Sequence, residues 1–194
     1  MRIGLQGKLR RDGERGSTLI ELMIAMLILA VGFAGVTTLM VTALASNNRA
    51  SRDTTATLLA QKVEEEISAQ NVYVDKDITV TDCANNVFTF ATTPGPVGVG
   101  TGANLNADKT IDFTQNFGAI PAGYAMRYVD CSAQGGLQIT YDVRWNVMSV
   151  SNNGSVRMII AGARPLASDV TKLGGLAYAK PTTLWGIGGP NTGE

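Results

Sequence analysis

The sequence of 194 residues contains no histidine, and this absence limits the chemistry available to it. Catalytic triads with an imidazole base, zinc sites of the HExxH kind and histidine general bases are all excluded. A catalytic site would have to use carboxylates, lysine, tyrosine or a lone nucleophile instead. The sequence shows no acid, base and nucleophile at a spacing typical of a catalytic site. The sequence therefore predicts neither an enzyme nor a cofactor.

Charged residues are also scarce. They make up 16% of the chain, whereas soluble domains typically contain about 25%, and hydrophobic residues make up 45%. The sixteen basic residues balance the sixteen acidic ones, which removes any basis for bulk nucleic-acid binding. The shortage of charge indicates that part of the chain does not face water.

Cysteine is limited to Cys83 and Cys131, which lie far apart and outside any CxxC spacing. That pattern is neither a redox motif nor a zinc site, and no other metal site is predicted. In an oxidising compartment the two residues are expected to form one disulfide. The alternative is a pair of small buried hydrophobic side chains.

The missing charge is concentrated in an apolar run of 24 residues, Leu22 to Ala45. As a helix this run spans about 36 Å, which is enough to cross a bilayer core of about 30 Å. Residues 1–16 carry five basic and two acidic side chains, so their net charge is +3. A basic flank before an apolar span places the N-terminus in the cytoplasm and the C-terminal part outside it, where a disulfide is favoured.

Three interpretations of this region compete. A secretory signal peptide is supported by the A-x-A pattern at Ala43-Leu44-Ala45, but its hydrophobic region is normally only about 7–15 residues long. An ordinary signal anchor accommodates the length. Neither explains Glu21 at the start of the span, because a carboxylate costs on the order of 2–3 kcal/mol when it is carried to the bilayer centre.

The third interpretation rests on the stretch Arg15–Ala25, which resembles the class III signal of type IV pilins and of type II secretion pseudopilins. Those proteins have a short basic leader ending in Gly, then T-L-I-E-L and a long apolar helix. The resemblance implies that residues 1–16 are a leader, that prepilin peptidase cleaves after Gly16, and that the new terminus at Ser17 is N-methylated. Ser17 departs from the usual Phe, and Thr38 stands where major pilins commonly carry Pro.

Glu21 has a physical role in this interpretation. After cleavage Ser17 would carry a free ammonium group, and residues 17 and 21 lie on one face of a helix. A neighbouring subunit can present its own terminal ammonium to the Glu21 carboxylate, and apolar surroundings heavily penalise an unpaired charge. Glu21 is therefore expected to set the register of assembly. The alternative is a carboxylate that only extends to lipid headgroups.

The helical pattern continues from the hydrophobic segment, residues 17–45, into residues 46–72. Leu59, Val63 and Ile67 recur at a spacing of four and predict one buried stripe. A helix from about Thr18 to Gln70 would be roughly 80 Å long. The acidic triplet at residues 64–66 is interpreted as a solvated helix face rather than as a functional site.

Residues 73–194 have the composition of a β domain. From Leu137 to Val147 apolar and polar residues alternate, which predicts a strand with one buried and one solvated face. A turn at residues 151–154 and a return strand at 156–160 follow, and further strands are expected at residues 78–80, 87–91, 111–113 and 124–130. The predicted fold is α+β, a long N-terminal helix packed on an antiparallel sheet. The Val-Arg-Trp strand with its return strand resembles PilV-type minor pilins.

Two segments resemble ligand-binding motifs but are interpreted as loops and turns without a ligand. Gly98-x-Gly100-x-x-Ala103 matches a dinucleotide fingerprint, but no amphipathic helix is expected after it to hold a phosphate. The order of Asp75, Asp77 and Asp82 lacks a calcium-binding EF-hand loop and favours solvated turn residues, although some pseudopilins bind calcium.

Two further segments are interpreted as surface loops. Asn153-Gly154-Ser155 is an N-glycosylation triplet that a hairpin turn explains. The glycine-rich tail from Leu173 to Glu194 is expected to wrap the surface or fray.

The resemblance implies a structural subunit of a type IV pilus-like filament, a minor pilin. Its expected partners are other pilin subunits, prepilin peptidase, the inner-membrane assembly machinery and the membrane itself. Its expected place is the inner membrane with residues 73–194 in the periplasm, and then a surface pilus or pseudopilus. The alternatives are a type II secretion or competence pseudopilin and, from a different class, a signal-anchored periplasmic binding protein or enzyme.

Overall fold

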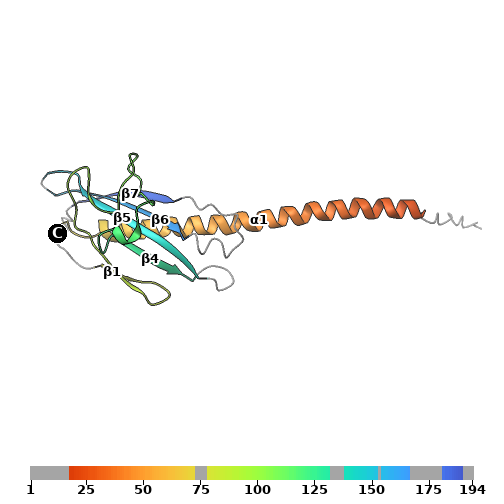
Figure 1. Cartoon of the computed structure of the whole chain (residues 1–194), viewed down its shortest axis with the longest axis horizontal. Coiled ribbons are helices and arrows are strands. Elements are labelled where there is room, and N and C mark those ends of the chain that lie inside the picture. The colour runs from red at the N-terminus through yellow and green to blue at the C-terminus, as the bar shows by residue number, and fades with distance from the viewer. Residues whose placement is uncertain (1–17, 73–77, 132–137, 153, 167–180, 190–194) are drawn as a thin grey trace, which may run out of the picture. The chain divides into compact units, whose positions relative to one another are not determined.

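The computed structural model describes residues 18–72, 78–131, 138–152, 154–166 and 181–189. The chain divides into two compact units, residues 1–44 and 45–194. Helix α1, Leu19–Ser68, contributes to both units, and all the described strands belong to the second (Figure 1). The long helix expected from the sequence is confirmed, with its end at Ser68 rather than Gln70.

In the first unit, every described side chain of α1 is exposed. The hydroxyls in this apolar stretch are satisfied within the helix: Thr37 and Thr38 donate to the carbonyl of Ala34, and Thr42 donates to the carbonyl of Thr38, each at 2.9 Å. These polar groups are therefore compatible with an apolar environment, because their donors already have partners.

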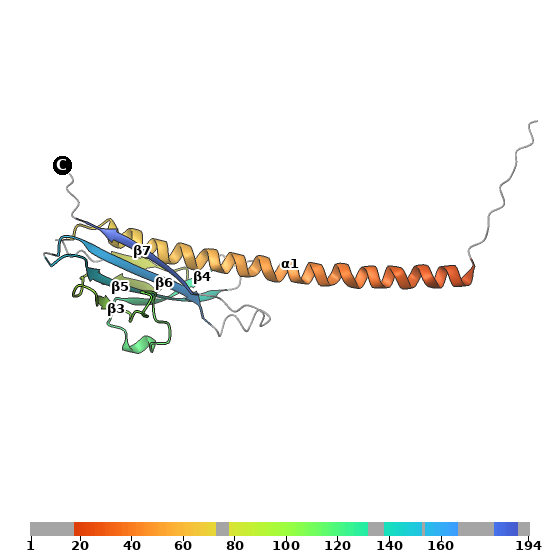
Figure 2. The same cartoon turned by 90° about the horizontal axis from the view of Figure 1, so that it is seen from above.

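In the second unit, α1 buries one stripe of side chains. Leu59, Val63 and Ile67 are buried at the predicted spacing, together with Ala56 and Ala60. They belong to one hydrophobic core with the inner faces of the strands, which confirms that the helix packs on a sheet (Figure 2).

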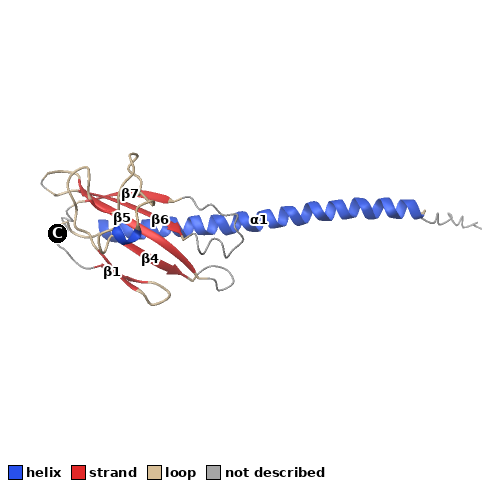
Figure 3. Ribbon diagram, viewed as in Figure 1, coloured by secondary structure: helices blue, strands red, loops and turns tan. Residues whose placement is uncertain are grey.

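The strands, red in Figure 3, form two antiparallel sheets. They are β1 Ile78–Thr81, β2 Val87–Phe90, β3 Thr101–Gly102, β4 Ala125–Asp130, β5 Ile139–Ser149, β6 Arg157–Pro165 and β7 Thr182–Gly188. Strands β1 and β2 form a hairpin, and the larger sheet has the order β3-β5-β6-β7 with β4 also paired to β5. Trp145 of β5 joins the two sheets, because its indole lies 4.8 Å from the ring of Phe90 and donates to the carbonyl of Ala91.

Strand β5 differs from the expectation that one of its faces is solvated. Asp142, Arg144 and Asn146 are only 2%, 2% and 3% exposed. Residues 95–119, which include a short 3-10 helix at Phe117–Ala119, hydrogen-bond to this face and cover it. The alternation of residue types is correct, but both faces of the strand are buried.

One loop expectation and one strand expectation are wrong. The tail contains β7, which pairs with β6 from Gly188 opposite Arg157 to Thr182 opposite Ala163. Residues 111–113 form no strand, and Ile111 makes only an isolated bridge with Leu105. Within the strand, Gly186 packs against the side chain of Glu64 and Gly188 against that of Arg157, so these two glycines are compatible with a closely packed strand.

Candidate assembly site

The predicted cleavage site, Gly16 and Ser17, lies outside the described residues. Glu21 lies just inside them, in the first turn of α1. Its backbone N–H donates to the carbonyl of Thr18 at 3.0 Å, and the N–H of Leu22 donates to the same carbonyl at 3.2 Å. A carboxylate in the first turn interacts favourably with the positive end of the helix dipole.

Glu21 stands at the beginning of a wide apolar surface. Large hydrophobic side chains such as Leu29 and Leu39 are 71% and 72% exposed along this part of α1. Soluble monomers rarely expose contiguous apolar surfaces of this kind, which usually contact lipid or another protein. By length and composition α1 is sufficient to cross a membrane.

Gly32 and Gly35 leave open space on this surface. A Cβ built on either glycine meets no atom within 4 Å, so nothing in this chain requires these positions to be small. Small residues on an apolar helix permit close approach of a second helix. The geometry is therefore suited to lateral packing of helices as well as to lipid contact.

The expected disulfide is present in the second unit. Cys83, which follows β1, is joined to Cys131, which follows β4, with 6.1 Å between their Cα atoms. The bond fastens the β1–β2 hairpin to the larger sheet.

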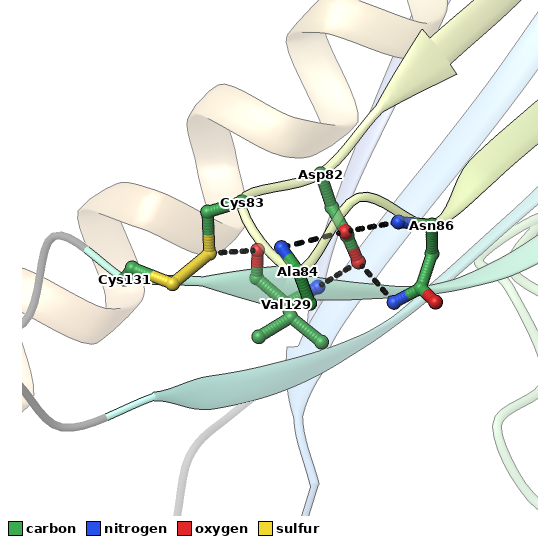
Figure 4. The surroundings of a disulfide bond; sticks show 6 residues. All are labelled: Asp82, Cys83, Ala84, Asn86, Val129 and Cys131. Atoms are coloured by element: carbon green, nitrogen blue, oxygen red, sulfur yellow. Dashed lines mark hydrogen bonds between the residues drawn. A yellow bond between two sulfur atoms is a disulfide. The ribbon is translucent and has the colours of Figure 1, made fainter.

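Asp82 holds the same junction without a covalent bond (Figure 4). Its carboxylate accepts hydrogen bonds from the backbone N–H of Ala84, Asn86 and Val129 and from the side-chain amide of Asn86. Burial alone raises the pKa of Asp82, but these hydrogen bonds outweigh burial and lower it. Asp82 is thus a structural acceptor and not the solvated turn residue expected from the sequence.

No metal site appears among the described residues, where no three His, Cys, Asp or Glu side chains gather. Asp75 and Asp77 lie outside the described part of the chain, and the oxygens of Asp82 are occupied by the donors named above.

A polar cluster that the sequence analysis missed fixes residues 112–117 to the outer face of the sheet. Arg144 binds both carboxylate oxygens of Asp142 at 2.8 Å and donates to the carbonyls of Asp112 and Gln115. Arg164 approaches the same carboxylate at 3.4 Å. The sequence feature that could have indicated this cluster is the pair Asp142 and Arg144, which lie two residues apart and therefore on the same face of the strand.

Two aromatic rings alternate with the arginine side chains in this cluster. The guanidinium of Arg144 lies 5.2 Å from the ring of Phe113 and 5.8 Å from that of Phe117. Arg164 contacts the first ring at 4.8 Å and Arg127 the second at 4.7 Å. These cation–π contacts add to the hydrogen bonds that hold the segment in place.

The glycine-rich segment has a packing role. Gly100 and Gly102 adopt φ values of 77° and 123°, which favour glycine. A Cβ on Gly100 would lie 1.9 Å from the side-chain oxygen of Asn146, and one on Gly102 would lie 2.3 Å from the carbonyl of Trp145. In the described stretch 103–116 no helix follows, as a dinucleotide site would require.

Comparison with known proteins supports the N-terminal part of the interpretation. Residues 11–37 match the family described as the prokaryotic N-terminal methylation motif. No curated protein and no solved structure gives a significant match to the chain. The motif and the apolar helix that follows it therefore indicate membrane anchoring, processing by prepilin peptidase and a subunit similar to type IV pilins or pseudopilins.

Proposed function

We propose that this chain is a minor pilin, a structural subunit of a type IV pilus-like filament that acts by assembly and performs no catalysis. The observation that carries the proposal is the methylation motif at residues 11–37 together with helix α1, whose first half is apolar and exposed. The motif supplies the processing signal, and the exposed apolar surface supplies the means of assembly.

In this proposal, cleavage after Gly16 leaves an ammonium group on Ser17. The Glu21 carboxylate of one subunit pairs with the N-terminal ammonium of its neighbour, because either charge alone is costly in apolar surroundings. Residues 73–194 lie in the periplasm before assembly and on the filament surface afterwards.

A type II secretion or competence pseudopilin would use the same physical interactions in a different machine. A signal-anchored binding protein or enzyme would instead remain in the membrane and need no charge pairing between subunits. The two classes are separated by where the mature protein is found.

The test is mass spectrometry of the protein from sheared surface filaments and from the membrane of the cells that produce it. The proposal predicts a mature N-terminus at Ser17, carrying one methyl group, in both fractions. A terminus at Ser46 would restore the signal peptide that ends at Ala43-Leu44-Ala45. An uncleaved protein confined to the membrane would support the signal anchor.

A further inference from the structure

Strand β7 is the last strand of the larger sheet, next to β6. Within the part of the chain that the structure describes, β7 is hydrogen-bonded to a strand on one side only. Its free side presents backbone N–H and C=O groups, which makes it a template for another strand. Figure 2 shows β7 alongside the second half of α1, and a Cβ built on Gly188 would lie 3.4 Å from the Cα of Ser68.

Two of the devices that usually protect a strand edge, charged side chains and proline, can be checked in β7 from its sequence. Residues 182–188 contain no charged residue and no proline. Trp185 and Ile187 are 54% and 67% exposed, and as residues two apart in a strand they lie on the same face. The indole is held in place, because its N–H donates to the carbonyl of Lys109 at 3.2 Å.

The opposite face of β7 lies against an acidic side chain of α1. A Cβ built on Gly186 would be only 1.8 Å from a carboxylate oxygen of Glu64, so this carboxylate lies directly on the strand. Partial burial, and then repulsion from Glu65, raise the pKa of Glu64. Among the described residues, no hydrogen bond or ion pair reaches the Glu64 carboxylate.

We propose that β7 is a docking edge for an extended segment of a different protein, with apolar side chains over Trp185 and Ile187 alternating with basic side chains directed toward Glu64. Main-chain hydrogen bonds would supply affinity, and the two faces of the strand would supply specificity. The proposal uses only residues of the second unit and does not depend on filament assembly.

A second copy of this chain fits the edge less well. Antiparallel pairing of two β7 strands would bring two Glu64 carboxylates onto the same face of the joined sheet, with no cation supplied by β7 to separate them. Like charges in partly buried positions repel, whereas a basic residue on the incoming strand would pair with the carboxylate.

The experiment measures the binding of two synthetic nine-residue peptides to the purified full chain in detergent by fluorescence anisotropy. One peptide alternates valine with lysine, and the other alternates valine with glutamate. The lysine peptide is expected to bind at least about tenfold more tightly, a difference of about 1.4 kcal/mol. Hydrogen exchange at residues 182–188 is expected to slow when it binds.

Matched variants assign the binding to β7. Ile187→Lys is expected to weaken binding of the lysine peptide at least about tenfold. Val87→Lys, at a residue that is 64% exposed on the separate hairpin, is expected to leave the binding of this peptide unchanged. Glu64→Gln removes the preference for lysine over glutamate, and Glu66→Gln on the exposed face of α1 keeps it.

The proposal is overturned by absence of binding, by equal binding of both peptides to the unmodified chain, or by binding that survives Ile187→Lys. Dimerisation of the chain alone that Ile187→Lys abolishes also overturns it, because the edge would then serve a second copy.

Discussion

At the residue scale, the Asp82 carboxylate connects the β1–β2 hairpin to β4. It accepts two backbone hydrogen bonds within its own turn and one from Val129 of β4. With a relative exposure of 4%, it has little water available to replace a lost partner. A change at this position should therefore loosen the junction rather than only the turn.

Asp82→Asn is expected to destabilise the protein by about 1–3 kcal/mol, because an amide nitrogen cannot accept the hydrogen bonds that one carboxylate oxygen now accepts. Asp108→Asn is the matched control, since Asp108 bonds Thr110 in an exposed turn and its replacement should leave stability nearly unchanged. Urea unfolding followed by circular dichroism measures both. Equal midpoints for the two variants would contradict the role assigned to Asp82.

The same carboxylate predicts a pH dependence. The pKa of Asp82 is lower in the folded protein, so its contribution is present above the unfolded value of about 4 and is lost as pH falls through the folded pKa. The stability difference between the wild type and Asp82→Asn should narrow when pH is lowered below about 4. A difference that stays constant from pH 7 to pH 2 would show that the charge of Asp82 is unimportant.

Arg144 provides a second prediction at this scale. Arg144→Met removes both 2.8 Å hydrogen bonds to the buried Asp142 and leaves the longer contact at 3.4 Å with the partly exposed Arg164, so the protein should lose about 3–5 kcal/mol of stability. Arg127→Met removes a cation–π contact at an exposed position and should cost only about 0.5–1 kcal/mol. Thermal unfolding of the two variants checks the ranking, and similar losses would refute it.

At the scale of elements, the disulfide and Asp82 hold the hairpin at one end while Phe90 and Trp145 pack farther along it. The sequence separation of 48 residues makes the Cys83–Cys131 bond worth about 4 kcal/mol in the chain-entropy model. The double replacement by serine should lower stability by up to that amount and increase proteolysis within residues 78–91. Alkylation without reductant, read by mass, should modify neither cysteine of the wild type, and two modified thiols would contradict the bond.

The helix and the central strands could be predicted because local patterns dominate there. Leu59, Val63 and Ile67 repeat at helical spacing and are buried, and residues 139–147 alternate at strand spacing and form a strand, so the type of each element follows from its pattern. The second buried face of β5 could not be predicted, since its cover comes from residues 95–119, which have no regular pattern of their own. Strand β7 was missed because the glycine-rich tail resembles a loop, and the sequence alone does not show that Gly186 packs against Glu64 of α1.

At the scale of the whole molecule, the motif with its apolar helix and the strand-containing part belong to different units of the chain. The methylation motif, Glu21 and the exposed apolar helix lie in residues 1–44, while the disulfide and the polar clusters lie in residues 45–194. A change confined to the first unit should therefore alter assembly and leave the fold of the second unit intact.

Glu21→Ala tests this account most directly, through the amount of the protein in sheared filaments relative to the membrane pool. If Glu21 pairs as proposed, its loss leaves the neighbour's ammonium uncompensated at a cost on the order of 2–3 kcal/mol and should reduce incorporation by more than about tenfold, with Glu21→Asp in between because its shorter side chain keeps the charge but loses reach. Cleavage after Gly16, the Cys83–Cys131 bond and the membrane pool should remain as in the wild type. Unchanged incorporation of Glu21→Ala would contradict the pairing mechanism, and a fall in total protein alone would point to an unstable anchor.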